Sequence, residues 1–327
     1  MHRRHGAVCS RGSMADVSSL GVSLPARAMR SESVLMRSLK EAWRALKADK
    51  FAMAGLFYLS TLLCVAVFAG YLAPHDPTHQ TLGRRLTPGI WAPSGSLTFP
   101  LGTDHLGRDM LSRLIYGSRI SIVVGLSTVA IAGVIGTLLG LVSGYYGGKL
   151  DDLIMRWADI QMAFPGLLLA LSVLALFGPS LQNMVLVLAL NNWMWYARLT
   201  RGVMLSLREV LFVEAARVVG ASNSRIIFKH CFPNLASPLI TLGTLEVARM
   251  ILSEASLSFL GFGVQPPTPA WGLMLAEGRG YLPIAWWLVT FAGICIGVTV
   301  LAINLVASWL RSVSDPHQRY KLLQQTG

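Results

Sequence analysis

Residues 120–146 read ISIVVGLSTVAIAGVIGTLLGLVSGYY, a run of 27 residues without a charged side chain. The hydrocarbon core of a bilayer takes about 20 apolar residues of helix to cross, so this run predicts a transmembrane helix. Four more apolar runs extend the pattern, at residues 51–73, 160–197, 235–260 and 281–310. Gly178-Pro179-Ser180 divides the run at 160–197 into two short spans. The sequence therefore predicts an all-α, polytopic membrane bundle of six transmembrane helices, because a spanning helix satisfies its own backbone hydrogen bonds.

The composition excludes two other classes of protein. Hydrophobic residues make up 53% of the 327 residues and charged residues only 13%, about half the share of a soluble domain. Intrinsic disorder requires low hydrophobicity and is excluded too. Four cysteines, Cys9, Cys64, Cys231 and Cys295, lie far apart in the chain, which indicates apolar fillers rather than a disulfide framework or a metal site.

The distribution of basic residues orients the bundle. Of the 28 Lys and Arg residues, 21 lie in the first 50 residues, the connections between spans two and three and spans four and five, and the tail. Six lie on the opposite side. The positive-inside rule makes the richer side cytoplasmic. We therefore expect a multi-pass protein of the inner or plasma membrane with both termini in the cytoplasm, and the net charge of +12 then indicates topology rather than nucleic-acid binding.

These spans divide the chain into five parts. They are a cytoplasmic tail (1–50), a first transmembrane helix (51–73), an external segment (74–117), a core of five transmembrane helices (118–310) with a cytoplasmic loop at 208–233, and a cytoplasmic tail (311–327). Within the first part, residues 34–50 place Leu35, Leu39, Trp43 and Leu46 on one face. This pattern predicts a basic amphipathic helix on membrane lipid, with a plain solvated helix as the alternative.

The spans lack the groups that intramembrane enzymes need. No histidine and no aspartate lies mid-span, which leaves a serine protease without a base and excludes an aspartyl protease. Gly147-Gly148-Lys149-Leu150 is the nearest approach to a phosphate-binding loop, but it lacks the hydroxyl after the lysine. We predict a non-catalytic chain that binds no cofactor and no metal ion.

Two features of the spans concern packing and polarity. The second span repeats a small residue every fourth position, which favours close approach of another helix: Thr128, Ala132, Gly136, Gly140 and Gly144.

The fifth span carries Glu246, Arg249 and Glu254, and each would cost about 2.5–3.5 kcal/mol facing lipid. Glu246 and Arg249 have the spacing of a helical ion pair, whereas Glu254 has no local partner. The three predict a translocation path or a subunit interface, or alternatively a structural pair.

The 208–233 loop has a helical pattern of its own. Residues 209–219 predict a helix that ends at Gly220, and Ser222 predicts the N-cap of a second short helix to about Cys231. Pro233 is expected to end that helix and lead into span five. Two short helices joined at a glycine would form a compact knob that docks into another protein, although a plain loop is the alternative.

The same loop resembles the EAA loop of ABC importer permeases. Glu214-Ala215-Ala216, three residues, Gly220, and twelve residues to Pro233 match the pattern E-A-A-x3-G-x9-I-x-L-P. His230 and Phe232 replace the usual isoleucine and leucine, and both keep a bulky side chain.

Other stretches resemble the C-type permease subunit of dipeptide and oligopeptide importers. They are LGTDHLGRD at 101–109 with LSRL at 111–114, GYYGG at 144–148 with Asp151-Asp152, and SFLGFGVQPP at 258–267 through Trp271-Gly272. Together these stretches cover roughly residues 35–316, in order, and each lies on the expected side.

The resemblance implies a type I ABC importer permease fold built from spans two to six, with span one added in front. It implies a second, B-type permease subunit, two ATPase subunits or one fused ATPase that use ATP and Mg, an extracytoplasmic substrate-binding protein and a peptide substrate. The implied ATPase-coupling residues are Glu214, Ala215, Ala216, Arg217, Gly220, Ser222 and Pro233. The implied binding-protein docking residues are Asp104, Arg108, Asp109, Gln265, Pro266 and Pro267.

Several alternatives stay open. A secondary transporter or channel acting alone would need no rigid cytoplasmic knob. Similar permeases import nickel or glutathione, and the absence of an intramembrane His or Cys cluster favours peptide over metal. Asp104, His105 and Asp109 allow a metal site, helix capping or contact with a delivery protein.

Overall fold

A computed structural model describes residues 43–314. The expectations for the cytoplasmic tails therefore lie mostly outside the described residues, and these include most of the amphipathic helix at 34–50. Residues 43–48, its last part, are helical. Throughout residues 43–314 the regular structure is helical, apart from one isolated bridge between Thr103 and Asp109. The all-α class is confirmed.

Four helices in this part of the chain are long and apolar enough to cross a membrane. They are α2 (Lys50–Val67), α4 (Met110–Tyr146), α11 (Phe232–Phe259) with the turns before it, and α13 (Trp287–Ser314). A fifth crossing is present if α5 (Gly148–Met162) and α6 (Gly166–Phe177), which are bent by 86°, count as one span. By length and composition, four or five of the six expected crossings are recognised within residues 43–314, so the number six is not confirmed.

The difference arises between residues 148 and 207, where the apolar run has three breaks instead of one. The predicted break is present, since Gly178 ends α6 with φ +86° and Ser180 caps α7 (Leu181–Leu190). Pro165, which has no N–H to donate, precedes α6. Asn191 and the next residue separate α7 from α8 (Trp193–Leu207), and the Asn191 side chain donates to the Gly166 carbonyl at 3.0 Å.

Aspartates start two of the long helices. Asp49 accepts hydrogen bonds from the backbone N–H groups of Phe51 and Ala52 at 3.1 and 3.0 Å, which begins α2. Asp109 caps α4 in the same way, and its side chain accepts from Leu111 and Ser112. Such caps satisfy N–H groups that have no partner within the helix. The expected first span at 51–73 corresponds to α2 and the short α3 (Ala69–Leu72).

The small-residue stripe of α4 packs against α8. A Cβ added to Gly136 would lie 2.1 Å from the carbonyl oxygen of Trp193, and one added to Gly140 would lie 2.5 Å from that of Ala197. Both distances are far shorter than any real contact, so only glycine permits this approach. The predicted close helix packing is confirmed, and its partner is now known.

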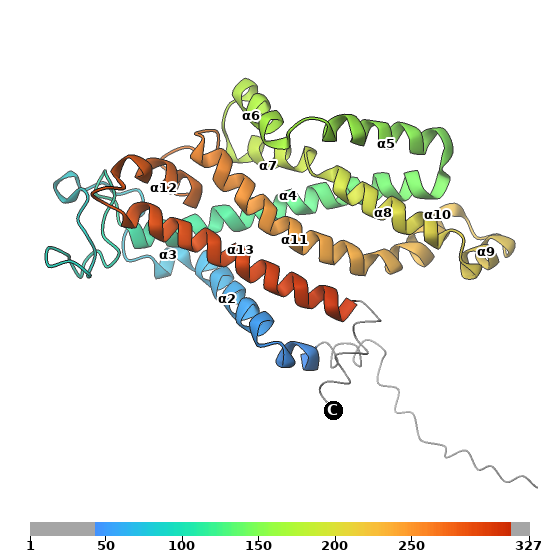
Figure 1. The fold of residues 1–327 in the computed structure, drawn as a ribbon, viewed down its shortest axis with the longest axis horizontal. Coiled ribbons are helices and arrows are strands. Elements are labelled where there is room, and N and C mark those ends of the chain that lie inside the picture. Colours follow the sequence, from blue (N-terminus) through green and yellow to red (C-terminus); the bar gives the residue numbers. More distant parts are fainter. Residues whose placement is uncertain (1–42, 315–327) are drawn as a thin grey trace, which may run out of the picture. The chain divides into compact units, whose positions relative to one another are not determined.

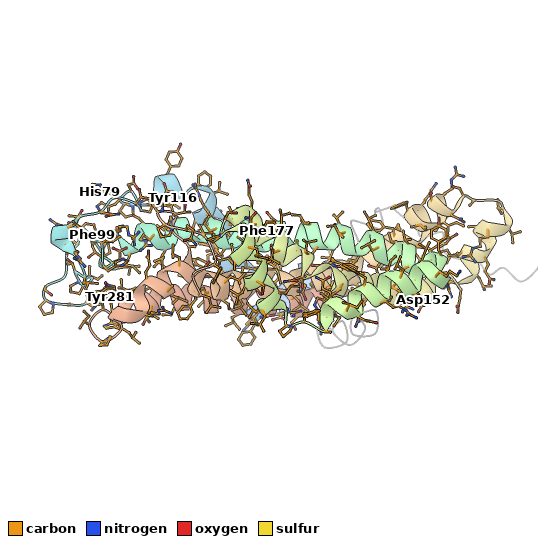
Figure 2. The ribbon with its side chains drawn as sticks, turned by 90° about the horizontal axis from the view of Figure 1, so that it is seen from above. His79, Phe99, Tyr116, Asp152, Phe177 and Tyr281 are labelled. Carbon is orange, nitrogen blue, oxygen red and sulfur yellow. The ribbon has the colours of Figure 1, made fainter. Side chains whose placement is uncertain are left out.

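Figure 1 shows how these helices place the connecting segments within residues 43–314. Helix α4 runs beside α8 and α11, and α13 packs on α11 and α2. The short helices α9 (Leu211–Val218) and α10 (Asn223–Arg225) lie at one end, and α12 (Trp271–Gly278) lies at the other with the segment before α4. His79, Phe99 and Tyr281 gather at the α12 end, far from Asp152 (Figure 2).

Candidate functional site

The 208–233 loop is seated on the bundle by one side chain of α9. Val213 is fully buried in a cluster from α4, α8, the π-helical turn at Ile226–Cys231 and the start of α11. The other members are Leu141, Tyr145, Met204, Ile226, Ile227, Cys231 and Leu235. The opposite side of α9 and its end expose large apolar side chains, with Leu211 80%, Val218 88% and Val219 87% accessible. Exposed apolar groups gathered on a protruding short helix are typical of a contact surface.

Gly220 turns the chain at the end of α9. Its φ is +82°, and its N–H donates to the Arg217 carbonyl at 2.9 Å. The N–H of Ala221 donates to the Ala216 carbonyl at 3.0 Å. This pair of bonds is a Schellman motif, which fixes the direction of the chain after a helix. The predicted helix end is confirmed.

The predicted second helix does not end at Pro233. Ser222 caps α10 by accepting from the Arg225 N–H at 3.4 Å, as expected. From there α10, a π-helical turn (Ile226–Cys231) and α11 continue as one helical stretch, Asn223–Phe259, of 37 residues. Pro233 is the second residue of α11 and directly follows the π-helical turn, so it removes one backbone N–H from the continuous stretch without ending it. The loop is therefore one short helix, a glycine corner and the start of a spanning helix.

The Glu214-Ala215-Ala216 segment lies on α9 with different exposures. Glu214 and Ala215 are exposed, whereas Ala216 packs partly against the buried cluster. The guanidinium of Arg217 lies 5.5 Å from the centre of the Tyr145 ring, and the Tyr145 hydroxyl donates to Asn223 at 2.8 Å. Glu214 and Ala215 are thus available for an external contact, while Arg217 helps hold the corner.

A second polar link near this end was not predicted from the sequence. Arg201 of α8 donates to both carboxylate oxygens of Asp151 on α5, at 2.5 and 2.7 Å. Ser143 of α4 donates to Asp151 at 2.5 Å. A bidentate arginine pair fixes relative orientation as well as distance, so this link joins α4, α5 and α8.

The charges of span five form two separate sites. Arg249 donates to Glu246 at 2.8 Å, which confirms the expected pair, and the Asn192 amide donates to the other Glu246 oxygen at 2.8 Å. Glu254 was expected to lack a local partner, and this was wrong. Ser258 donates to it at 2.7 Å, one turn further along α11, and Ser121 of α4 lies 3.4 Å away.

A buried ion-pair network closes the segment before α4. Asp104 pairs with Arg108 at 2.6 Å and with Arg113. Glu277 of α12 pairs with the same two arginines, at 3.0 and 2.7 Å. Burial alone would raise the pKa of Asp104, but the two guanidinium groups outweigh it and hold the pKa below its usual value. The network ties the segment before α4 to α12.

This network corrects the expected docking role of Asp104, Arg108 and Asp109. Their side chains are at most 2% exposed, and Asp109 is occupied as the cap of α4. Buried and paired side chains cannot form a contact surface in this conformation. Gln265, Pro266 and Pro267 are exposed in the loop after α11, so for them docking stays a prediction.

One group of side chains has the spacing of metal ligands. Ligand atoms of Asp104, His105 and Glu277 lie within 4.8 Å of one another, whereas Asp109 lies outside the group. Burial lowers the pKa of His105, which stacks on Tyr281 with ring centres 5.5 Å apart. Both carboxylates already neutralise Arg108 and Arg113, so a cation there would meet two positive charges.

No sequence motif marks Glu277 or Asn192 as a site residue. Their partners lie 169 and 54 residues away in the chain, and each sits in an ordinary local context. Only an uncharged amide inside an apolar run could have drawn attention to Asn192.

Two family models match this chain. Residues 136–320 match the binding-protein-dependent transport system inner membrane component, and residues 38–88 match the N-terminal transmembrane domain of oligopeptide transport permease C. A solved chain titled as an inward-facing conformation of the MetNI methionine ABC transporter shares the fold, with a TM-score of 0.51 at 18% identity. It covers 62% of this chain and 97% of its own length.

Similar sequences extend over almost the whole length. A di/tripeptide transport system permease protein of Pseudomonas aeruginosa is 45% identical over 85% of this chain and 92% of its own. A dipeptide transport system permease protein of Escherichia coli is 45% identical over 88% and 95%. A glutathione transport system permease protein of Pectobacterium atrosepticum is 40% identical over 85% and 90%.

Proposed function

The chain belongs to the family of binding-protein-dependent transport system inner membrane components and is a permease subunit of an ABC importer; we propose that its substrates are di- and tripeptides. The observation that carries this proposal is the 45% identity to a di/tripeptide permease across 92% of that relative. A glutathione permease at 40% is the nearest competing assignment, and glutathione is itself a modified tripeptide.

In the proposed mechanism an ATPase subunit binds α9. The exposed side of α9 carries Glu214, Ala215 and Leu211, and Val213 fixes the helix to the bundle. A push on α9 passes through the Gly220 corner into α11 without another loop, since α10, the π turn and α11 are continuous. ATP and Mg act in the partner subunits, and this chain supplies no catalytic group and no cofactor site.

The partners follow from the same proposal. A second, B-type permease completes the path, two ATPases or one fused ATPase dock at the α9 end, and an extracytoplasmic binding protein delivers peptide at the α12 end. The opposite placement of α9 and α12 supports a cytoplasmic 208–233 loop and an external segment at 74–117. Both termini are then cytoplasmic, and Gln265, Pro266 and Pro267 offer an exposed external loop for docking.

Uptake tests the substrate directly. A strain that lacks its own dipeptide and glutathione permeases receives this chain with its companion subunits, and labelled dipeptide, tetrapeptide, glutathione and nickel are supplied in turn. We expect strong dipeptide uptake and weak tetrapeptide uptake. Uptake of glutathione or nickel with no dipeptide uptake contradicts the proposal, and uptake by the purified chain without partners contradicts the importer mechanism.

A further inference from the structure

A cavity of about 440 Å³ lies among α5, α6, α7, α8 and α11. Its volume is in the range of small-molecule sites, about 300–1,000 Å³. Apolar side chains form much of the wall, and five polar residues interrupt them: Gln161, Asn191, Asn192, Arg249 and Ser253. Arg249 is the charged member, and it lies well inside α11.

The Arg249 guanidinium is held in place on two sides. It donates to Glu246 at 2.8 Å and lies 5.3 Å from the centre of the Trp195 ring. Glu246 is itself fixed, because Asn192 donates to its second oxygen. The positive group therefore has a defined position rather than a range of rotamers.

The pair is asymmetric in its exposure. The Glu246 side chain is 3% exposed and that of Arg249 is 54% exposed. An arginine has five N–H donors in a planar fork. Among residues 43–314, Glu246 is the only acceptor with which Arg249 forms a hydrogen bond, so donors remain toward the cavity. The carboxylate of the pair is thus enclosed, whereas the guanidinium is open to the cavity.

The planar guanidinium of Arg249 indicates a carboxylate ligand, because a guanidinium can donate two parallel hydrogen bonds to a carboxylate. We propose that Arg249 receives the C-terminal carboxylate of the peptide during its passage; this inference rests on the proposed function. The carboxylate is common to peptides of every sequence, so the contact does not depend on the peptide's side chains. Glu246 lowers the net charge of the site, which keeps binding weak enough for release, as conduction requires.

The test compares two peptides in two proteins. The full transporter in proteoliposomes, with its binding protein, takes up labelled alanyl-alanine or alanyl-alanine amide, and the ratio of initial rates is measured for wild type and Arg249→Gln. Any preference of the binding protein enters both ratios equally and cancels in the comparison. We expect the acid-to-amide ratio to fall about tenfold in the variant, the size of one charge-assisted contact. Arg156→Gln, an exposed arginine outside the cavity lining, is the matched control and should keep the wild-type ratio.

Each outcome decides the matter. An unchanged ratio, or equal loss of both peptides, overturns the inference and leaves the proposed function standing. Failure of the wild-type transporter to take up either peptide overturns the proposed function itself. If Arg249→Gln does not assemble, Arg249→Lys carries the test, because it keeps the charge and loses the fork. A ratio below that of wild type supports the inference, and a ratio equal to it contradicts it.

Discussion

At Gly220 the backbone angle, not the space around it, restricts the residue type. Its φ is +82°, and a Cβ added there would meet nothing within 4 Å. Alanine costs about 1–2 kcal/mol in this left-handed region, and proline cannot adopt it at all. We expect Gly220→Pro to insert normally while ATP-driven uptake falls to roughly a tenth or less, with Gly220→Ala in between.

The control for that variant is Gly202→Ala on α8, since Gly202 also has nothing within 4 Å but has an ordinary helical angle. Its uptake should equal that of wild type. Membrane content measured by immunoblot, together with vesicle uptake, separates loss of coupling from loss of protein. Normal uptake by Gly220→Pro would contradict the proposed transmission of force.

Asp104 is expected to make the segment before α4 sensitive to acid. Its pKa lies below the ordinary value of 3.8, so its stabilising contribution is complete above that value and is lost as the pH falls through the lower folded value. We expect the segment before α4 to resist protease down to about pH 4 and to open in stronger acid. Limited proteolysis of the purified protein across pH measures this.

Replacing one arginine of the network should move that transition. Arg113→Met leaves the buried carboxylates short of a partner, at a cost of about 3–5 kcal/mol, and raises the pH at which cleavage begins. Arg279→Met, at an exposed position nearby, should leave it unchanged. The same transition pH in Arg113→Met would show that the network does not hold the segment.

At the scale of elements, the contact of α4 with α8 depends on glycine. A side chain at Gly136 would meet the Trp193 carbonyl, which is backbone and cannot turn aside. We expect Gly136→Val to separate the two helices and to reduce the yield of folded protein and its melting temperature by several degrees. Thermal unfolding in detergent, followed by size-exclusion chromatography, measures both.

Gly297→Val on α13 is the matched control, because Gly297 has open space where Gly136 has backbone. It should melt close to wild type. If the two variants melt alike, then the stripe of small residues on α4 is not what brings α8 close.

The elements differ in how well sequence predicts them. The stripe at every fourth residue predicts a close contact because spacing alone creates a flat face, but it does not name α8 as the partner. The sequence analysis does not predict the breaks at Pro165 and Asn191. A run defined by the absence of charged residues includes both an amide side chain and a proline. Pro233 predicts a helix end, but the helical stretch continues through it from the π-helical turn into α11.

At the scale of the whole molecule, the proposed orientation predicts which side each end faces. Val218 is exposed at the α9 end and Gln265 in the loop after α11. In a variant whose native cysteines are replaced, we expect Val218→Cys to react with an impermeant thiol reagent only in inverted vesicles. Gln265→Cys should react only in intact cells or spheroplasts, and it serves as the opposite control. Reversed labelling would invert the topology.

The candidate site was predictable in part. The corner at Gly220 is formed by local hydrogen bonds, so the residue types Gly220 and Ser222 predict it directly from the sequence. The ion-pair network and the Asn192 contact join residues far apart in the chain, and nothing local marks them. The sequence predicts a docking role for Asp104, Arg108 and Asp109, and it does not show that they are buried, because burial depends on tertiary structure.

The unbroken stretch from Asn223 to Phe259 has 37 residues, and a helix of that length measures about 55 Å against a hydrocarbon core of about 30 Å. It begins at the Gly220 corner beside α9 and ends at the loop that contains Gln265. Arg249, whose guanidinium lines the cavity, is one of its residues. In the proposed transporter one continuous helical stretch thus connects the ATPase end of the protein to the far side of the membrane. A fluorophore attached to the loop that contains Gln265 would then change its signal with nucleotide binding to the ATPase subunits.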